Sequence, residues 1–318
     1  MEPSGKSRSP LIMAGMHRSG TSLGASLLES AGLDVGERLM EGNWSNPRGH
    51  YEDLDFVELH KDALKVLGLD PDGWVLTELP ELPGDVVDRA RLLVEQRQAS
   101  GRAWGFKDPR ATLFLRMWAE ICPEARFLFV HRVPWEVVDS LYRRGDAVFS
   151  TDPELAIQAW LYYNRAILDF SNHAPARCSF VNVETIAEYP VEWVAAVAKH
   201  AGIALGPPSP SIYEAGLLHG SLARARASVI VEHFPDAIRL FGALEARAWR
   251  PAGAPAVPFR SGATPETERR LALEDWHQIC VVSGERDKLR EELGARANER
   301  EAPPADGNGA AAPGDGLT

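Results

Sequence analysis

A loop near the start of the sequence has the residue types and spacing of an anion-binding loop. The apolar run Leu11–Ala14 leads into Gly15–Ser22, GMHRSGTS, and an amphipathic stretch follows it. This order predicts a strand, a tight loop that contains two glycines, and a helix whose N-terminus faces the loop. Backbone N–H groups and the positive end of the helix would then point at one phosphate or sulfate group.

The loop departs from the phosphate-binding loop of nucleoside triphosphatases at one position. In the pattern G-x-x-x-x-G-K-[ST] the Lys reaches the outer phosphates, and this chain has Thr21 in its place. The change argues against hydrolysis of ATP or GTP, and Arg18 can supply a cation from within the loop. The alternative is an ordinary strand-to-helix turn in which Ser and Thr side chains cap the helix.

Two further cationic groups follow apolar runs that are typical of buried strands. Ala103–Phe106 is followed by Lys107, in the sequence KDPR, and Arg126–Val130 leads to Arg132. The carboxyl ends of parallel strands share one edge of a sheet, so these cations are expected to gather there with the cation of the loop. Ser140 follows Arg132 by about two helical turns, and the two side chains would suit a second phosphate.

Helices and short apolar strands alternate over most of the sequence. This alternation predicts an α/β fold with a mostly parallel central sheet flanked by helices. A further strand is expected at residues 178–183. Helices are expected at residues 54–67, 85–99, 112–121, 135–144, 190–201 and 234–248, together with a long helix that Asp152 caps and that ends near Phe170.

The composition argues against several kinds of partner and site. A net charge of −11 over 318 residues argues against nucleic acid as a partner. The three cysteines lie far apart and the nine histidines form no H-E-x-x-H pattern, so no metal site is expected. Residues 1–9 contain no apolar segment and no stretch is long enough to span a membrane, so a cytoplasmic location is the expectation.

Together these elements resemble those of a known enzyme family. The loop GMHRSGTS, the element VHRVPWEVVDS and the sequence KDPR are similar to those of the sulfotransferases that use PAPS (3′-phosphoadenosine 5′-phosphosulfate), particularly the bacterial members. The KDP element also resembles that of the protein-tyrosine sulfotransferases. The resemblance covers roughly residues 10–205, including FVNVETIAEYPVEW, and implies a P-loop NTPase-like sulfotransferase fold.

The resemblance implies roles for the loop and for the strand ends. The loop Arg18–Ser22 would bind the 5′-phosphosulfate, and Arg132 with Ser140 would bind the 3′-phosphate, with PAP as the product. Lys107 and Arg18 would neutralise the charge that develops as the sulfate leaves. His17 would touch the sulfate or face solvent. The implied nucleotide-binding residues are His17, Arg18, Ser19, Gly20, Thr21, Ser22, Arg132 and Ser140.

The general base that takes the proton of the acceptor is expected in the loop after the first helix. The element NPRGHYE resembles a bacterial pattern that ends in Glu, which favours Glu52; His50 is the second candidate, because imidazole titrates near neutral pH. Each assignment has a structural alternative. Glu52 would instead stabilise the start of the helix near Leu54, and Lys107 would form a surface ion pair with Asp108.

The predicted activity is transfer of the sulfuryl group of PAPS to a hydroxyl group of an acceptor, which is a small-molecule natural product, a glycan or a peptide. Such transfer depends on in-line positioning and electrostatic stabilisation, and the resemblance implies that it needs no divalent metal. Two alternatives stay open. One is a P-loop kinase that uses ATP, which would require Lys at position 21, and the other is a non-catalytic nucleotide-binding module.

The sequence also suggests how the chain is divided. Residues 10–245 would form the sulfotransferase domain after a flexible N-terminus at residues 1–9. Residues 246–300 would contain a linker rich in Pro, Gly and Ala and then a charged helix, through which a homodimer could form. Residues 301–318 would be a disordered tail.

Overall fold

The computed structural model describes residues 10–42, 49–210, 227–255 and 264–301. The chain divides into two compact units, Met1–Ala263 and Thr264–Thr318, and each is described by itself. The predictions for the N-terminus (1–9) and for the tail (302–318) lie outside the described residues. A domain boundary near residue 245 stays a prediction.

Four parallel strands form the sheet of the first unit, in the order β2-β1-β3-β4. They are β1 (Leu11–Ala14), β2 (Gly105–Lys107), β3 (Arg126–His131) and β4 (Cys178–Asn182). Because β1 lies between β2 and β3, the chain leaves the centre of the sheet first to one side and then to the other. In open α/β sheets ligands bind where the strand order reverses, which in this sheet is at the carboxyl end of β1.

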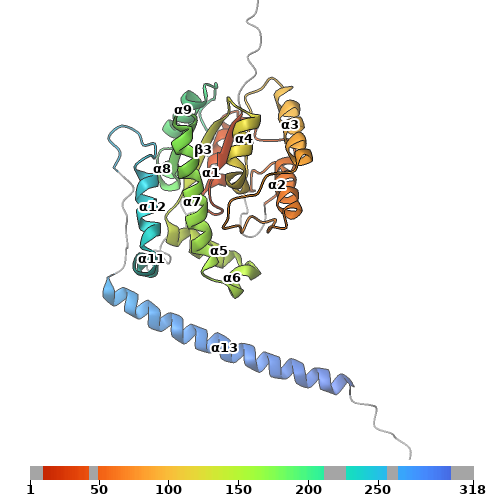
Figure 1. Cartoon of the computed structure of the whole chain (residues 1–318). Coiled ribbons are helices and arrows are strands. Elements are labelled where there is room, and N and C mark those ends of the chain that lie inside the picture. Colours follow the sequence, from red (N-terminus) through yellow and green to blue (C-terminus); the bar gives the residue numbers. More distant parts are fainter. Residues whose placement is uncertain (1–9, 43–48, 211–226, 256–263, 302–318) are drawn as a thin grey trace, which may run out of the picture. The chain divides into compact units, whose positions relative to one another are not determined.

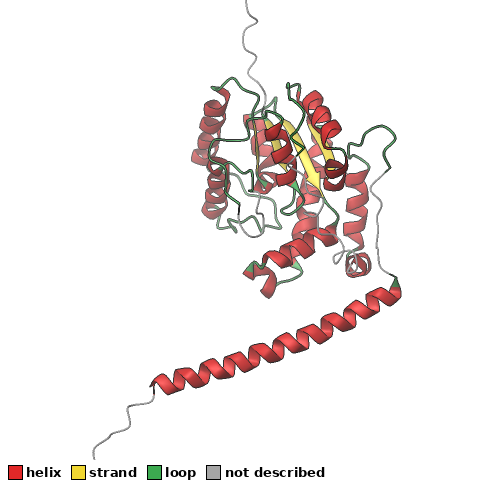
Figure 2. Ribbon diagram, turned by 180° about the vertical axis from the view of Figure 1, so that it is seen from behind, coloured by secondary structure: helices red, strands yellow, loops and turns green. Residues whose placement is uncertain are grey.

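Helices cover both faces of the sheet (Figures 1 and 2). Side chains alternate along each strand, so Ile12 and Phe127 enter one buried apolar cluster, whereas Leu11 and Leu128 enter the other. The second cluster includes α1 (Thr21–Ser30), α8 (Val183–Glu188) and α9 (Pro190–Ala201). The first includes α2 (Leu54–Val66), α3 (Gly84–Gln98), α4 (Leu115–Ile121), α5 (Pro134–Arg144), α7 (Leu155–His173), α11 (Ala227–His233) and α12 (Pro235–Glu245). The predicted α/β fold with a parallel sheet flanked by helices is therefore confirmed.

Most of the expected helices are present with small shifts of their ends, and local capping explains the exceptions. The helix expected from residue 112 is preceded by a 3-10 helix, η1 (Pro109–Phe114), because the Asp108 side chain accepts the Arg110 backbone N–H and starts the turn early. The long helix α7 begins at Leu155, with Glu154 rather than Asp152 at its N-cap.

The end of β4 also differs from the prediction. Val183 was expected in the strand but begins α8, because the Asn182 side chain accepts the backbone N–H of Glu184 and caps this helix. Further along the chain, Ala248 forms a bridge to Phe180 of β4, and the Trp249 N–H donates to the Phe180 carbonyl oxygen at 2.7 Å. A short helix that was not expected, α6 (Ala147–Thr151), follows α5.

The loop between β1 and α1 requires glycine at both of its ends. A Cβ atom on Gly15 would lie 2.4 Å from the Val130 carbonyl oxygen, so the loop passes close to β3. A Cβ atom on Gly20 would lie 2.1 Å from the Val183 side chain, and Gly20 has a φ of 91°. Both positions therefore exclude any larger residue.

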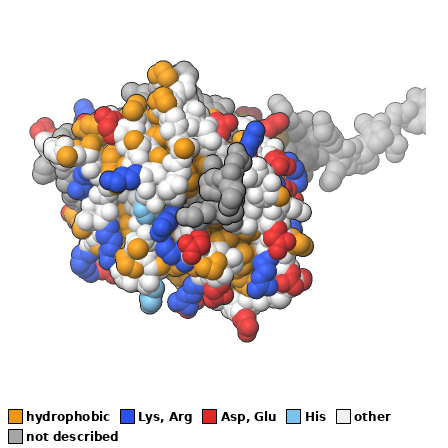
Figure 3. Space-filling model, turned by 90° about the horizontal axis from the view of Figure 1, so that it is seen from above, with side chains coloured by type: hydrophobic (Ala, Val, Ile, Leu, Met, Phe, Trp, Pro, Cys, Tyr) orange, Lys and Arg blue, Asp and Glu red, His pale blue; other side chains and the backbone are white. Residues whose placement is uncertain are grey.

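The second unit contains one long helix, α13 (Pro265–Glu301). Its apolar residues, which include Leu273, Trp276 and Ile279, are distributed around the helix and do not form a single stripe. A homodimer through this helix stays a prediction. Within the described ranges no helix has the length and apolar character needed to cross a membrane. On the face drawn in Figure 3, basic and acidic side chains are interspersed.

Replacement of Gly20 by Ala tests the close approach of the loop to α8. Gly32→Ala is the matched control, because Gly32 also has a positive φ of 102° but no atom lies within 4 Å of a Cβ there. The control should cost about 1 kcal/mol in unfolding free energy from backbone strain. Gly20→Ala should cost about 1–3 kcal/mol more, because Val183 must move. Urea unfolding measures both, and equal losses would contradict the packing described here.

Candidate active site

The candidate active site lies at the carboxyl edge of the sheet, around the loop Gly15–Gly20. The Ser19 backbone N–H closes a turn on the Met16 carbonyl oxygen at 3.2 Å, and the Gly15 N–H donates to Thr112 Oγ1 at 3.1 Å. Arg18 is one of two described residues other than glycine with a positive φ, at 65°. This backbone directs the loop toward the strand ends that carry the other predicted cations.

Cationic side chains surround Arg18. Burial lowers the pKa of Arg18 to about 10, and the positive charges of Arg144, Arg132 and Arg143 reinforce the shift. Each of these three guanidinium groups also pairs with a carboxylate, so together with Arg18 four cations face three carboxylates in this part of the site. The Arg18 Nε atom donates to Ser140 Oγ at 2.9 Å, so two residues predicted to bind opposite ends of the nucleotide are in contact.

Arg132 is buried and is held by its own helix. Its Nε atom donates to Glu136 Oε2 at 2.8 Å. The Trp160 indole N–H donates to the Arg132 carbonyl oxygen at 3.1 Å, which fixes the backbone where β3 leads into α5. These contacts hold the guanidinium group in place before any ligand binds.

Lys107 is buried and contacts three groups. Its Nζ atom lies 2.6 Å from Glu52 Oε1, 3.2 Å from Ser22 Oγ and 3.1 Å from the His50 carbonyl oxygen. The alternative of a surface ion pair with Asp108 is therefore wrong, because Lys107 is 3% exposed and pairs with Glu52 instead. The ammonium group lies between the start of α1 and the loop that carries both candidate bases.

Arg110 is a residue of this site that the sequence analysis did not assign. Its Nη2 atom lies 3.1 Å from Glu52 Oε2, and its Nε atom lies 3.2 Å from the Asp108 carboxylate. Burial opposes the charged form, but Asp108 and Glu52 outweigh it and raise the pKa of Arg110. Its position in KDPR, directly after the end of a strand, was the feature of the sequence that could have identified Arg110 as part of the site.

The two candidate bases have different surroundings. Both Glu52 oxygens are in ion pairs, one with Lys107 and one with Arg110. The helix-capping role considered for Glu52 belongs to Asp53, whose side chain accepts the Asp55 backbone N–H at the start of α2. Burial lowers the pKa of His50, although Glu52 opposes this shift, so the imidazole is neutral at neutral pH.

His17 is buried rather than directed to solvent. Its ring lies 5.0 Å from that of Trp74 and 6.0 Å from that of Tyr163, centre to centre. Burial holds the pKa of His17 well below its usual value, and the charges of Arg110 and Arg144 add to the shift. The neutral ring can therefore donate one hydrogen bond and accept another.

Several polar atoms near the loop are ready for an anionic ligand. Among the residues that the structure describes, buried Ser19 Oγ, Arg132 Nη2 and His17 Nε2 have no hydrogen-bond partner. No side chain caps α1, so the alternative of a turn capped by Ser or Thr is wrong. The N-terminus of a helix that begins without a side-chain cap can present backbone N–H groups to a ligand or to water. These atoms fit the oxygens of a phosphosulfate group and of a second phosphate.

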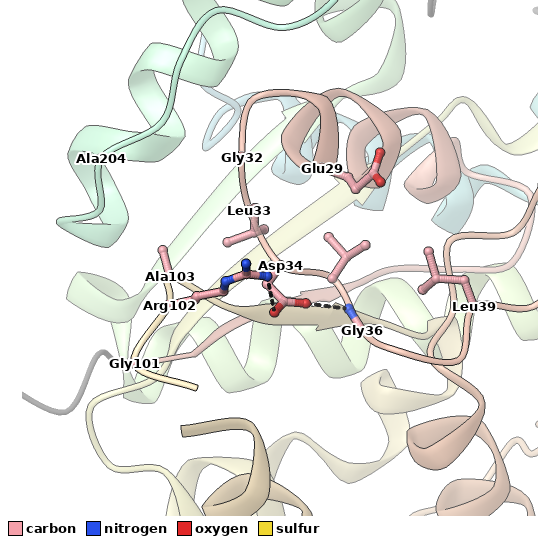
Figure 4. A pocket seen from close by; sticks show the side chains of 11 residues that line it. Glu29, Gly32, Leu33, Asp34, Gly36, Leu39, Gly101, Arg102, Ala103 and Ala204 are labelled. Carbon is pink, nitrogen blue, oxygen red and sulfur yellow. Dashed lines mark hydrogen bonds and ion pairs between the residues drawn. The ribbon is translucent and has the colours of Figure 1, made fainter. Parts of the chain in front are cut away.

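A separate pocket of about 630 Å³ lies at the opposite edge of the sheet (Figure 4). Glu29 in the last turn of α1, Asp34 and Arg102 line it, and Ala103 leads from it into β2. No predicted site residue lines this pocket. The candidate active site is therefore defined by the residues around the loop.

Replacement of Arg110 by Met tests how much the Arg110 side chain contributes to the stability of the protein. The change keeps the length of the side chain but leaves Asp108 and Glu52 with one fewer buried cation. It should lower the unfolding free energy by about 3–5 kcal/mol, because an ion pair is broken inside the protein. The matched control is Arg116→Met, since Arg116 forms an exposed pair with Glu78 and should lose less than about 1 kcal/mol. Similar losses in both variants would contradict the buried network.

The chain is similar to several solved structures of sulfotransferases. No curated protein matches the chain. Among solved structures, the sulfotransferase domain of the Synechococcus PCC 7002 olefin synthase is 22% identical, with 70% of this chain and 83% of that chain covered and a TM-score of 0.40. A sulfotransferase from Alicyclobacillus acidocaldarius is 16% identical, with 76% and 97% covered and a TM-score of 0.46. Sulfotransferase STF9 from Mycobacterium avium is 15% identical, with 86% and 77% covered and a TM-score of 0.42.

The family described as the sulfotransferase family matches residues 10–207. This match begins at the residue before β1, includes all four strands and ends after α9. It spans more than half of the 318 residues. The chain therefore belongs to the sulfotransferase family.

Proposed function

We propose that this protein transfers the sulfuryl group of PAPS to a hydroxyl group of an acceptor. Membership of the sulfotransferase family supports sulfuryl transfer in general. The observation that carries the finer proposal is the position of Lys107. Its ammonium group lies 3.2 Å from Ser22 at the end of the anion-binding loop and 2.6 Å from the Glu52 carboxylate.

Each residue has a defined task in this proposal. The bound donor supplies the sulfuryl group and accepts charge on its phosphate as the S–O bond breaks. Arg18 and the N–H groups at the start of α1 hold the phosphosulfate, and Lys107 neutralises the departing oxygen. Arg132 and Ser140 hold the 3′-phosphate. The acceptor oxygen forms the new bond to sulfur, and its proton moves to a base.

Glu52 is the proposed base, and His50 is the second candidate. Glu52 Oε1 can take a proton only when Lys107 no longer pairs with it, so loss of the acceptor proton is linked to the position of Lys107. Arg110 holds the other oxygen and keeps the carboxylate oriented. His50 is neutral and needs no such change, but its ring Nε2 is buried.

Calorimetric titration with 3′,5′-ADP, 5′-AMP and ATP–Mg²⁺ tests the nucleotide. Micromolar binding of 3′,5′-ADP alone is expected. Arg132→Ala should weaken 3′,5′-ADP by roughly tenfold to a hundredfold, the value of a charge-assisted hydrogen bond, and leave 5′-AMP nearly unchanged. The matched control is Arg126→Ala, because Arg126 begins β3 at the other edge of the sheet. Preference for ATP–Mg²⁺ would instead indicate the kinase. Binding of 3′,5′-ADP without sulfate transfer would indicate a non-catalytic module.

Variants of the two candidate bases distinguish their roles. Glu52→Gln should lower kcat by about 10²–10⁴ if Glu52 takes the proton. His50→Gln should lower it by less than about tenfold. Burial lowers the pKa of His50, and its protonation at acid pH would slow the reaction only if His50 were the base. A fall in kcat/KM at acid pH that disappears in His50→Gln would therefore overturn the assignment of Glu52.

A further inference from the structure

We propose that His60, Trp118 and Asp108 are positioning residues that fix Arg110 and, through it, Glu52 and Lys107. This inference rests on the proposed function, because it assigns these residues to the same reaction. None of the three was assigned a role in the reaction from the sequence. They form a buried series of hydrogen bonds that starts in the hydrophobic core and ends at the candidate base.

The series begins between two helices. The Trp118 Nε1 atom of α4 lies 3.0 Å from His60 Nε2 of α2, and His60 Nδ1 lies 2.8 Å from Asp108 Oδ2. All three side chains are fully buried. The His60 ring also lies 4.8 Å from the Phe114 ring, centre to centre and nearly parallel to it.

The donors and acceptors allow only one protonation state of His60. An indole N–H can donate but cannot accept, so His60 Nε2 must be the acceptor and carries no proton. The ring proton is then on Nδ1, and it donates to Asp108. His60 is therefore neutral in a fixed tautomer, and Trp118 determines which tautomer is present.

Asp108 connects His60 to Arg110. Besides His60, it accepts the Arg110 backbone N–H at 2.9 Å and the Arg110 Nε–H at 3.2 Å. Burial disfavours the charged carboxylate, but the Arg110 charge and the His60 hydrogen bond hold the pKa of Asp108 well below its usual range. Asp108 therefore stays ionised, and its two bonds to Arg110 fix where that guanidinium group meets Glu52.

The last two contacts reach the reacting groups. Arg110 Nη2 donates to Glu52 Oε2, and Glu52 Oε1 accepts from Lys107 Nζ. A neutral His60 keeps the series electrically balanced, since two cations then face two carboxylates. Misplacement of a catalytic group by about 1 Å can cost about a hundredfold in rate, so loss of His60 should affect kcat although His60 touches no substrate.

Two substitutions at His60 separate hydrogen bonding from packing. In His60→Asn the amide nitrogen can occupy the place of Nδ1 and donate to Asp108, whereas His60→Leu removes the donor. We expect His60→Leu to lower kcat for sulfate transfer from PAPS by about tenfold or more, with the Kd for 3′,5′-ADP within about threefold, and His60→Asn to restore most of it. Phe114→Leu is the matched control, because Phe114 packs on His60 but makes no polar contact in the series. An equal loss of kcat in Phe114→Leu would overturn the proposal.

Nitrogen NMR of the full chain tests the series without any activity. The wild-type protein should show His60 protonated on Nδ1 and not on Nε2, and the Arg110 Nε and Lys107 Nζ signals should shift in His60→Leu but not in Phe114→Leu. If His60→Leu does not fold, Trp118→Phe, which removes the N–H donor and one ring but keeps an aromatic side chain, should shift the His60 signals. A proton on Nε2, or unchanged Arg110 and Lys107 signals, would overturn the inference. Absence of sulfate transfer in the wild type with these signals as expected would overturn the proposed function alone.

Discussion

A buried ammonium group with no opposite charge beside it would cost several kcal/mol or lose its proton. Lys107 can remain charged at the carboxyl edge of the sheet because the Glu52 carboxylate lies 2.6 Å away. The rest of the site depends on this pair. It fixes the loop that contains His50 and Glu52 against the start of α1, and it places a cation beside the anion-binding loop.

The pair also divides the site into two parts with different electrostatics. Around Glu52, two cations and two carboxylates balance one another, since Lys107 and Arg110 face Glu52 and Asp108. Around Arg18, four guanidinium groups face three carboxylates; burial lowers the pKa of Arg18, and the charges of the neighbouring guanidinium groups add to the shift. A balanced, rigid part suits proton transfer and orientation, whereas an excess of positive charge suits a dianionic ligand.

The sequence predicted those parts of the structure that depend on local pattern. Apolar runs identified the strands, and Pro134 and Pro190 marked the beginnings of α5 and α9. The residue types after the strands indicated an anion site, since such charges gather at one edge of a parallel sheet. Pairings between distant residues were not predictable. His60 lies in an amphipathic helix, where a buried polar residue gives no periodic signal, and its partner Asp108 is 48 residues away.

The residues that cap α2 and α8 were a second feature that the sequence did not predict. Asp53 rather than Glu52 caps α2 because Arg97, from α3, binds the Asp53 side chain at 2.6 Å and holds it beside the helix start. Likewise, Asn182 ends β4 and also donates to Glu245 Oε1 of α12 at 2.7 Å. In both cases the capping residue is an Asp or Asn, which are preferred at the N-cap, and a contact with a remote helix also holds its side chain.

The bridge between Phe180 and Ala248 lies on the outer edge of the sheet. β4 lies at one end of the sheet, so the N–H and carbonyl groups on its outer side form an edge on which another strand could pair. The backbone of Ala248 and Trp249 occupies part of this edge, and Glu245 ties α12 to the ends of β3 and β4 through His131 and Asn182. The residues that follow α12 thus cover part of the outer edge of β4, where unpaired backbone groups would otherwise be open to another strand.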